Sequence, residues 1–307
     1  MTSLKRHVAT NLNNYLTVVG SINREHDERT WFRGHSSAFY QLLPSVLRET
    51  TPLRDNAGRK LRGNEQLNSS GYTVTGLSVE RMLDEFKRKA RPFVSPLPLS
   101  DFEWLFLMQH YGVPTRLLDW TTNALVALYF ATETISPKTH KSENDAADKF
   151  MAGDEVRDDG LAIYAIDPHE INRETHGIKY AVDICEDEKW SAYARPMEPS
   201  NSDTYLPLCV LAPHNSPRIR AQSGTFTIHG SNIWPLDYYD ALRPLIHKIF
   251  IPYSSISSLQ DDLVSVGLTT SFIYPDLAGV SREIKLGEMR RYGLERSRWL
   301  KSFSNDV

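Results

Sequence analysis

The sequence predicts an α+β fold, with helices concentrated in the N-terminal half and strands in the C-terminal half. Apolar residues in the first half recur at the spacing of helices, whereas short apolar runs in the second half are typical of strands. The chain has 307 residues, of which 40% are hydrophobic, enough to bury the core of one large domain or two small ones.

Charge and cysteine content narrow the functional classes. The formal net charge of −3 gives no overall attraction to nucleic acid or to an anionic membrane. The two cysteines, Cys185 and Cys209, show no metal-type spacing and follow no signal peptide, so we expect a reducing, cytoplasmic setting. No stretch of 18 apolar residues predicts a transmembrane helix. No Walker loop, Rossmann glycine triplet or metal-ligand spacing is present, so we expect no metal.

The first half begins with helical periodicity. Residues 1–30 predict an amphipathic helix that ends at Gly20. Residues 30–35 then predict a short aromatic strand that carries an arginine followed by a glycine. Residues 50–77 are polar and rich in glycine, asparagine and arginine, which predicts a long surface loop. Helix signals return at residues 78–90.

The block of residues 109–121 lies between two apolar segments. Ser100 and Glu103 form a capping-box pattern at the start of the first apolar helix. The expected boundaries after it are a helix end at Gly112 and Pro114, an extended run over 115–120, and a helix over 123–131 that is apolar on every side. Polar residues of the block are therefore placed beside the core.

The second half alternates between strands and polar segments. A polar insertion is expected over residues 136–160. The expected strands cover residues 161–166, 208–211, 223–228, 248–251 and 270–274, and a helix runs from about 255 to 266. Residues 282–301 carry many lysines and arginines, which indicates a solvated helix face or, alternatively, a nucleic-acid contact.

Two charged residues of the central block need partners. Burying a charge costs several kcal/mol unless it is paired, so Arg116 and Asp119 are expected to pair with each other or with a ligand. Asp119 is the stronger functional candidate, because a carboxylate in a loop beside buried apolar helices is unfavourable unless it has an ion-pair partner or a functional role.

Four motifs together resemble the FRG-domain family, which is named for its Phe-Arg-Gly triplet. They are Phe32-Arg33-Gly34, residues 109–121, residues 217–226 and Tyr274-Pro275-Asp276-Leu277. The resemblance covers about residues 28–285 and leaves outside it an N-terminal helical extension, residues 1–27, and a basic helical tail, residues 286–307. FRG domains occur in bacterial proteins, often in toxin or phage-defence contexts.

A weaker resemblance is to mono-ADP-ribosyltransferases of the arginine–serine–glutamate type, which implies an ADP-ribosyltransferase-like mixed sheet core and NAD as co-substrate. It places Arg33 at the NAD phosphates or nicotinamide ribose, Thr121 at the final hydroxyl of the middle motif and Gln222 at the start of the third motif. Gly224 stands where that family has its catalytic glutamate. The carboxylates nearest the motifs are those of Asp119, Glu103 and Asp276.

The candidate site follows from the motifs and the resemblance. Catalytic candidates are Arg33, Asp119, Gln222, His110 and Glu103, and candidates for binding NAD are Arg33, Gly34, Arg116, Thr121 and Gln222. Structural alternatives stay open at several of them. His110 is an acid or base, or a histidine at a helix terminus; Glu103 is explained by the capping box; Thr121 is also a helix cap. Asp276 is expected mainly to bond backbone amides in a turn.

These resemblances imply a cytoplasmic, NAD-dependent mono-ADP-ribosyltransferase that acts as a toxin or defence effector on a protein or nucleic-acid acceptor. RNA or DNA remains a candidate acceptor, because two segments are basic: the arginine-rich loop around Arg54, Arg59 and Arg62, and the tail. A toxin further implies an inhibitory antitoxin protein. The alternatives are an NAD glycohydrolase with the same site and a non-catalytic module that binds a nucleotide or phage component.

Overall fold

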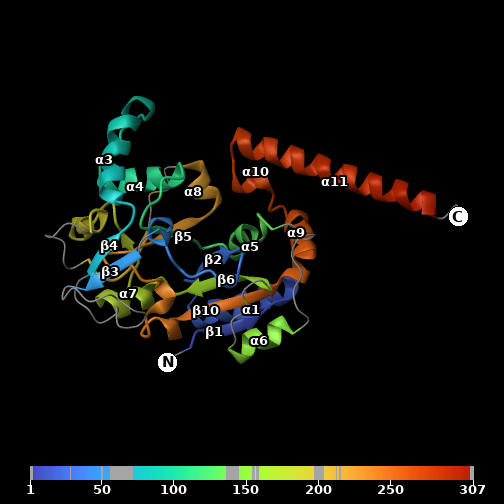
Figure 1. Cartoon of the computed structure of the whole chain (residues 1–307), viewed down its shortest axis with the longest axis horizontal. Helices are drawn as coiled ribbons and strands as arrows, with labels where there is room; N and C mark the ends of the chain where they lie inside the picture. The colour runs from blue at the N-terminus through green and yellow to red at the C-terminus, as the bar shows by residue number, and fades with distance from the viewer. Residues whose placement is uncertain are drawn as a thin grey trace.

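The fold is organised around one mixed sheet of eight strands, and the predicted α+β class is confirmed. The computed structural model describes residues 3–27, 29–49, 51–55, 72–135, 145–153, 156, 159–196, 204–211, 213 and 216–304. The strand order is β1-β10-β6-β2-β5-β9-β8-β7 (Figure 1). Within this sheet β1 pairs with β10 and β7 with β8 in parallel, and the other neighbours are antiparallel.

The strands of the sheet are short except at its centre. Their bounds are β1 Lys5–Val8, β2 Trp31–His35, β5 Leu117–Thr121, β6 Gly160–Ile166, β7 Val182–Asp183, β8 Leu208–Leu211, β9 Gly224–Ile228 and β10 Ile246–Pro252. A separate two-stranded sheet joins β3, Thr51–Asp55, to β4, Tyr72–Thr75.

Helices flank the sheet and occur in both halves of the chain. Their bounds are α1 Leu12–Glu25, α2 Ser45–Arg48, α3 Val79–Ala90, α4 Asp101–His110, α5 Ala124–Thr132, α6 Ala146–Ala152, α7 Pro168–His176, α8 Pro217–Ala221, α9 Ile256–Ser265, α10 Thr270–Ile273 and α11 Leu277–Ser304. Because α11 alone has 28 residues, the expected concentration of helices in the first half is not found. Figure 1 shows α11 running away from the rest of the molecule.

The central strand β6 has a different hydrophobic cluster on each face. Its seven residues are all buried, and its side chains alternate between the two faces as a strand requires. Leu161, Ile163 and Ala165 join the cluster beneath α1, α5 and α9. Ala162, Tyr164 and Ile166 join the cluster on the opposite face. A third cluster lies under α3 and α4, against β5 and β9.

Two predicted elements are wrong at the N-terminus and at residues 270–274. The predicted helix of residues 1–30 is a strand, β1, followed by α1, which continues past Gly20 to Glu25. The predicted strand over 270–274 is the short helix α10, because the Thr269 hydroxyl accepts a hydrogen bond from the Phe272 amide at 3.4 Å. Spacing of three then buries Thr270 and Ile273 on one side of that turn.

The two polar segments contain regular structure at their described ends. Strands β3 and β4 lie in the segment expected to be a loop, and α6 lies in the insertion 136–160. Arg59 and Arg62 lie outside the described residues, and Arg54 lies on β3. No helix in the described part of the chain is long and apolar enough to cross a membrane.

Candidate functional site

Arg33 lies on β2, where the sheet opens between β2 and β5. The backbones of the two strands are paired at Phe32 and Thr121. Next to this pair, the Arg33 side chain, and not the β2 backbone, donates the hydrogen bond to β5. Its Nη1 donates to the carbonyl of Asp119 at 2.6 Å, and its Nε donates to Nε2 of His35 at 2.8 Å. Burial lowers the pKa of Arg33 and the charge of Asp119 opposes that effect; an arginine stays protonated in either case.

Asp119 presents a carboxylate to solvent in a fixed orientation. Its side chain is 57% exposed and its Oδ2 lies 3.5 Å from Nη1 of Arg33. Nε2 of Gln109 lies 3.1 Å from each carboxylate oxygen, and Oε1 of Gln109 accepts from the Thr115 hydroxyl at 2.6 Å. The carboxylate is thus held from α4 and from β2 while it remains accessible.

Thr121 connects β5 to the segment before β9. Its hydroxyl donates to the carbonyl of Gln222 at 2.6 Å and accepts from the Asn123 amide at 3.0 Å. The N-cap of α5 is Asn123, so the expected capping role of Thr121 is wrong. The Gln222 side chain donates to the carbonyl of Ile273 at 3.1 Å. Both residues therefore fix the backbone beside Asp119, which lies on the same face of β5 as Thr121.

A group of charged and aromatic side chains gathers between the end of α4 and the start of α11. Burial lowers the pKa of His110, the charge of Arg218 adds to this, and Asp276 opposes it. The guanidinium of Arg218 lies 4.7 Å from the ring centre of Tyr274. Asp276 accepts from the Gly279 amide at 2.7 Å, which confirms its expected bond to a backbone amide.

Glu133 also lies in this region, although it was not among the candidate site residues predicted from the sequence. It accepts hydrogen bonds from the Tyr274 hydroxyl at 2.9 Å and from Arg282 at 2.7 Å. Burial raises the pKa of the Tyr274 hydroxyl and the charge of Glu133 raises it further, so the phenol stays neutral. Glu133 follows an apolar helix in a polar sequence segment, and nothing in its local pattern points to Tyr274.

The glycines of two motifs have different surroundings. A Cβ on Gly34 would lie 1.9 Å from the carbonyl oxygen of Ala127 on α5. The α-carbon of Gly34 is therefore covered by α5, which gives this glycine a packing reason, and its expected part in NAD binding stays a prediction. A Cβ on Gly224 would meet Ile219 at 3.5 Å, an ordinary contact.

Arg116 and Glu103 lie away from Asp119. Arg116 immediately precedes β5 and lies three positions before Asp119, so along an extended chain the two side chains point to opposite faces. Arg116 is buried and donates to the carbonyl of Gly230 at 2.6 Å. Glu103 accepts from the Leu99 amide at 2.5 Å at the start of α4, which confirms its helix-capping role. Six residues of helix, about 9 Å, separate it from Gln109.

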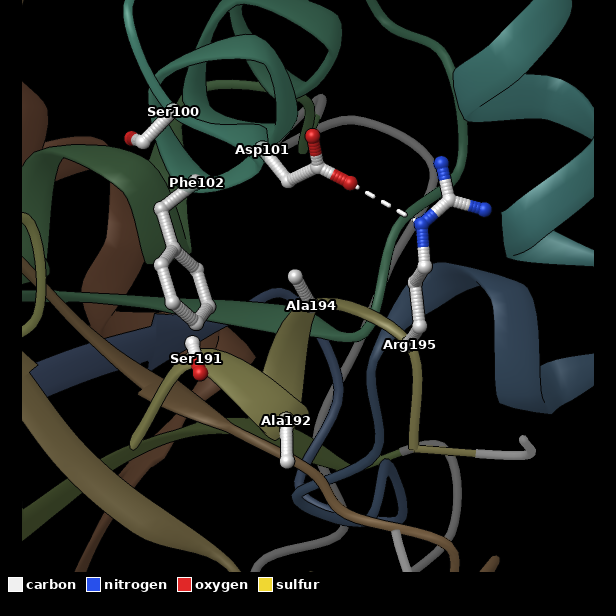
Figure 2. Close-up of a pocket in the computed structure, with 7 residues that line it drawn as sticks. All are labelled: Ser100, Asp101, Phe102, Ser191, Ala192, Ala194 and Arg195. Atoms are coloured by element: carbon white, nitrogen blue, oxygen red, sulfur yellow. Dashed lines mark hydrogen bonds and ion pairs between the residues drawn. The ribbon is translucent and has the colours of Figure 1, made fainter. Parts of the chain in front are cut away.

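A pocket opens at the other end of α4. It has a volume of about 380 Å³ and lies between the start of α4 and the 3₁₀ helix Glu188–Ala194 (Figure 2). Asp101 and Arg195 line one side of it and are paired at 3.0 Å. Eight residues of α4, about 12 Å, separate Asp101 from Gln109. This pocket is therefore distinct from the surface around Arg33 and Asp119.

Comparison with known proteins identifies one part of the chain. Residues 28–140 match the family model of the FRG domain, so the chain contains an FRG domain. The match begins at the expected residue and includes Phe32-Arg33-Gly34 and residues 109–121, whereas the expected extension to residue 285 stays a prediction. No curated protein and no solved structure matches the chain.

Proposed function

We propose that this FRG-domain protein is an NAD-dependent mono-ADP-ribosyltransferase, and that Asp119 and Arg33 form the centre of its site. The observation that carries the proposal is a solvent-facing carboxylate held by Gln109 at 3.1 Å to both oxygens and lying 3.5 Å from a guanidinium. A guanidinium can bind phosphate through two parallel hydrogen bonds. A fixed carboxylate can stabilise the positive charge that develops on a ribose as its leaving group departs.

The residues have separate roles in this proposal. Arg33 has five N–H donors, and its bonds to His35 and Asp119 use two of them, so a diphosphate could engage others. Asp119 replaces the glutamate that the resemblance expects at Gly224. Thr121 and Gln222 position the strand ends beside the nicotinamide ribose. Nicotinamide leaves, and the acceptor, a protein or nucleic acid, gives up a proton as its bond to the ribose forms.

The biological setting is part of the same proposal. A transferase of this kind in a bacterial cell would act as a toxin or phage-defence effector in the cytoplasm. It would require an inhibitory antitoxin protein, because uncontrolled transfer would harm its own cell.

A specific observation favours a second candidate, a module that binds a nucleotide without turning it over. No carboxylate occupies position 224, and Arg33 already bonds to backbone and to His35 within the sheet. Hydrolysis of NAD without an acceptor is a further possibility for the same site.

The experiment uses purified protein, radiolabelled NAD and a cell extract separated into protein and nucleic-acid fractions. Asp119→Asn should lower the rate of transfer by about 10²–10³, the range for loss of one transition-state stabiliser. Because the side chain is largely exposed, the melting temperature should change by only a few degrees. Asp261→Asn is the matched control, since Asp261 is an exposed carboxylate 3.5 Å from an arginine, Arg290, outside the site.

Each outcome points to one candidate. Label on protein or nucleic acid that is lost in Asp119→Asn but kept in Asp261→Asn supports the transferase and gives the class of acceptor. Free nicotinamide without transferred label indicates NAD hydrolysis. NAD binding in calorimetry without consumption, with any inhibitory partner removed, would replace the proposal with the binding module.

A further inference from the structure

Three potential metal-ligating side chains meet where the end of α1 packs against β10. Glu25 is the last residue of α1, His26 follows it as the C-cap, and His247 lies on β10. One ligand atom from each lies within 4.8 Å of the other two. All three lie outside the matched region 28–140.

His247 supplies a buried nitrogen that has no hydrogen bond. Its side chain is 2% exposed, and Nδ1 lies 2.9 Å from Nε2 of His7 on β1. Nε2 is buried and without a hydrogen-bond partner; it faces Oε2 of Glu25 at 3.6 Å, beyond hydrogen-bond distance. Buried polar atoms almost always have a hydrogen-bond partner. A buried nitrogen without one, which faces a carboxylate and a second imidazole, therefore indicates a binding position for an ion between the three side chains.

The contacts around Glu25 and His26 leave one atom of each side chain available to coordinate an ion. Oε1 of Glu25 pairs with Lys5, which leaves Oε2 facing His247. Nδ1 of His26 lies 3.2 Å from the Thr30 hydroxyl, which leaves Nε2 as the coordinating nitrogen. The rings of His26 and His247 meet edge to face with centres 5.1 Å apart.

We propose that Glu25, His26 and His247 bind one divalent transition-metal ion, with zinc as the ion whose preferences they match. Two imidazoles and a carboxylate form a common zinc ligand set, and a fourth position is left for water. Ligand atoms in a tetrahedral zinc site lie about 3.4 Å apart, so modest side-chain rotations would complete the site. The ion would link the end of α1 to β10 and so attach the N-terminal segment to the sheet.

The hydrogen bond between His247 and His7 supports this assignment. A metal on Nε2 of His247 requires the proton on Nδ1, and this proton would be donated to Nε2 of His7. Such a bond fixes the ring orientation and tautomer of a ligating histidine.

The test measures zinc binding to the full-length chain after removal of metal with a chelator and of any affinity tag. Glu25→Gln keeps the shape of an exposed side chain and removes the ligating charge. The wild type should bind one zinc per chain in calorimetry, and Glu25→Gln should bind it at least about tenfold more weakly. Glu85→Gln is the matched control, because Glu85 is an exposed glutamate that pairs with a lysine, Lys89, on α3 and is not part of the cluster.

A second measurement tests the identity of the ligands. Cobalt added to the wild type should give the visible absorption of a tetrahedral nitrogen–oxygen site, and His247→Gln should lose it. If His247→Gln does not fold by circular dichroism, the zinc titration of Glu25→Gln alone decides the question. Equal zinc affinities of wild type and Glu25→Gln, or no zinc binding by the wild type, would overturn the proposal.

Discussion

The α-carbon of Gly34 lies so close to α5 that the third residue of the Phe-Arg-Gly triplet has a packing role. An added Cβ would lie 1.9 Å from the Ala127 carbonyl and 2.8 Å from the Ala131 amide nitrogen. Both atoms are helix backbone, so α5 itself would have to move. The close contact in turn holds β2, and with it Arg33, in position beneath the helix.

Gly34→Ala should therefore lower the free energy of unfolding by about 3 kcal/mol or more, at or above the upper end for over-packing in a core. Gly224→Ala is the matched control, because its Cβ would make an ordinary 3.5 Å contact with Ile219. It should change stability by less than about 1 kcal/mol. Urea unfolding of both variants provides the measurement. A stable Gly34→Ala with weakened NAD binding would instead restore a ligand-contact role for this glycine.

The candidate residues could be selected from the sequence, but the partners of their side chains could not. The extended run over 115–120 and the resemblance were sufficient to bring Arg33 and Asp119 to one site. The partners were not predictable, because β2, α4 and β5 come together only in the folded sheet. There Gln109 contacts the Asp119 carboxylate, and Arg33 donates to His35 and to the Asp119 carbonyl. Local spacing likewise missed His247, which is distant in sequence from Glu25 and His26 but lies close to both in the fold.

At the scale of elements, a charged cluster joins α3, α4 and the 3₁₀ helix Glu188–Ala194. Asp101, the first residue of α4, pairs with Lys87 of α3 and with Arg195, which follows the 3₁₀ helix. Arg195 also bonds to Asp84 of α3 at 2.5 Å. These contacts hold the helix whose opposite end carries Gln109 and His110.

Stability should depend on Asp101 in a defined pH range. Burial raises the pKa of Asp101, but the hydrogen bonds from Lys87 and Arg195 outweigh it and leave the pKa lowered. A carboxyl whose pKa is lowered by folding stabilises the protein above its unfolded pKa of about 3.9, and the effect is lost as the pH falls through the folded pKa. Asp101→Asn should therefore cost about 1 kcal/mol at pH 7, given partial exposure.

The measurement is urea unfolding of wild type and Asp101→Asn from pH 7 to about pH 2.5. The difference between the two proteins should shrink as the pH falls below about 4. Asp261→Asn, in which an exposed aspartate is changed, should follow the wild type throughout. A difference that stays constant with pH would mean that the packing of Asp101 matters and its charge does not.

Strong periodicity and caps made most elements predictable, whereas short segments were decided by tertiary contacts. The strand β6 was predicted because the six apolar residues 161–166 follow one another, as is typical of a strand at the centre of a sheet. Four of the five residues 270–274 are β-branched or aromatic and thus favour a strand in isolation. The threonine cap and the burial of Ile273 instead produce one turn of helix at α10.

At the scale of the whole molecule, the sheet draws on nearly the full length of the chain. Strand β1 forms one edge by parallel pairing with β10, and β2 lies between β6 and β5. Tyr15 and Ile22 of α1 are fully buried in the cluster beneath α5 and α9. Among the described residues of the FRG match at 28–140, two strands belong to the main sheet, β2 and β5.

A chain that begins at residue 28 should not fold cooperatively. Deleting residues 1–27 removes the buried Tyr15, Val19 and Ile22, each worth about 1.5–3 kcal/mol, together with the pairing of β1. The sum approaches the total stability of about 5–15 kcal/mol that is typical of a domain. A chain that ends at residue 285 is the control. It keeps Arg282 on Glu133 and Glu283 on the Ser271 amide, and the side chains it loses from α11 are exposed where they are described.

Thermal unfolding followed by circular dichroism distinguishes the two truncations. The chain of residues 1–285 should melt in one cooperative transition near that of the full chain, because removal of the outer part of α11 uncovers no core. The chain of residues 28–307 should show no such transition. Cooperative melting of residues 28–307 would mean that the remaining strands form a stable sheet without β1 and α1, and that the N-terminal segment is a dispensable extension.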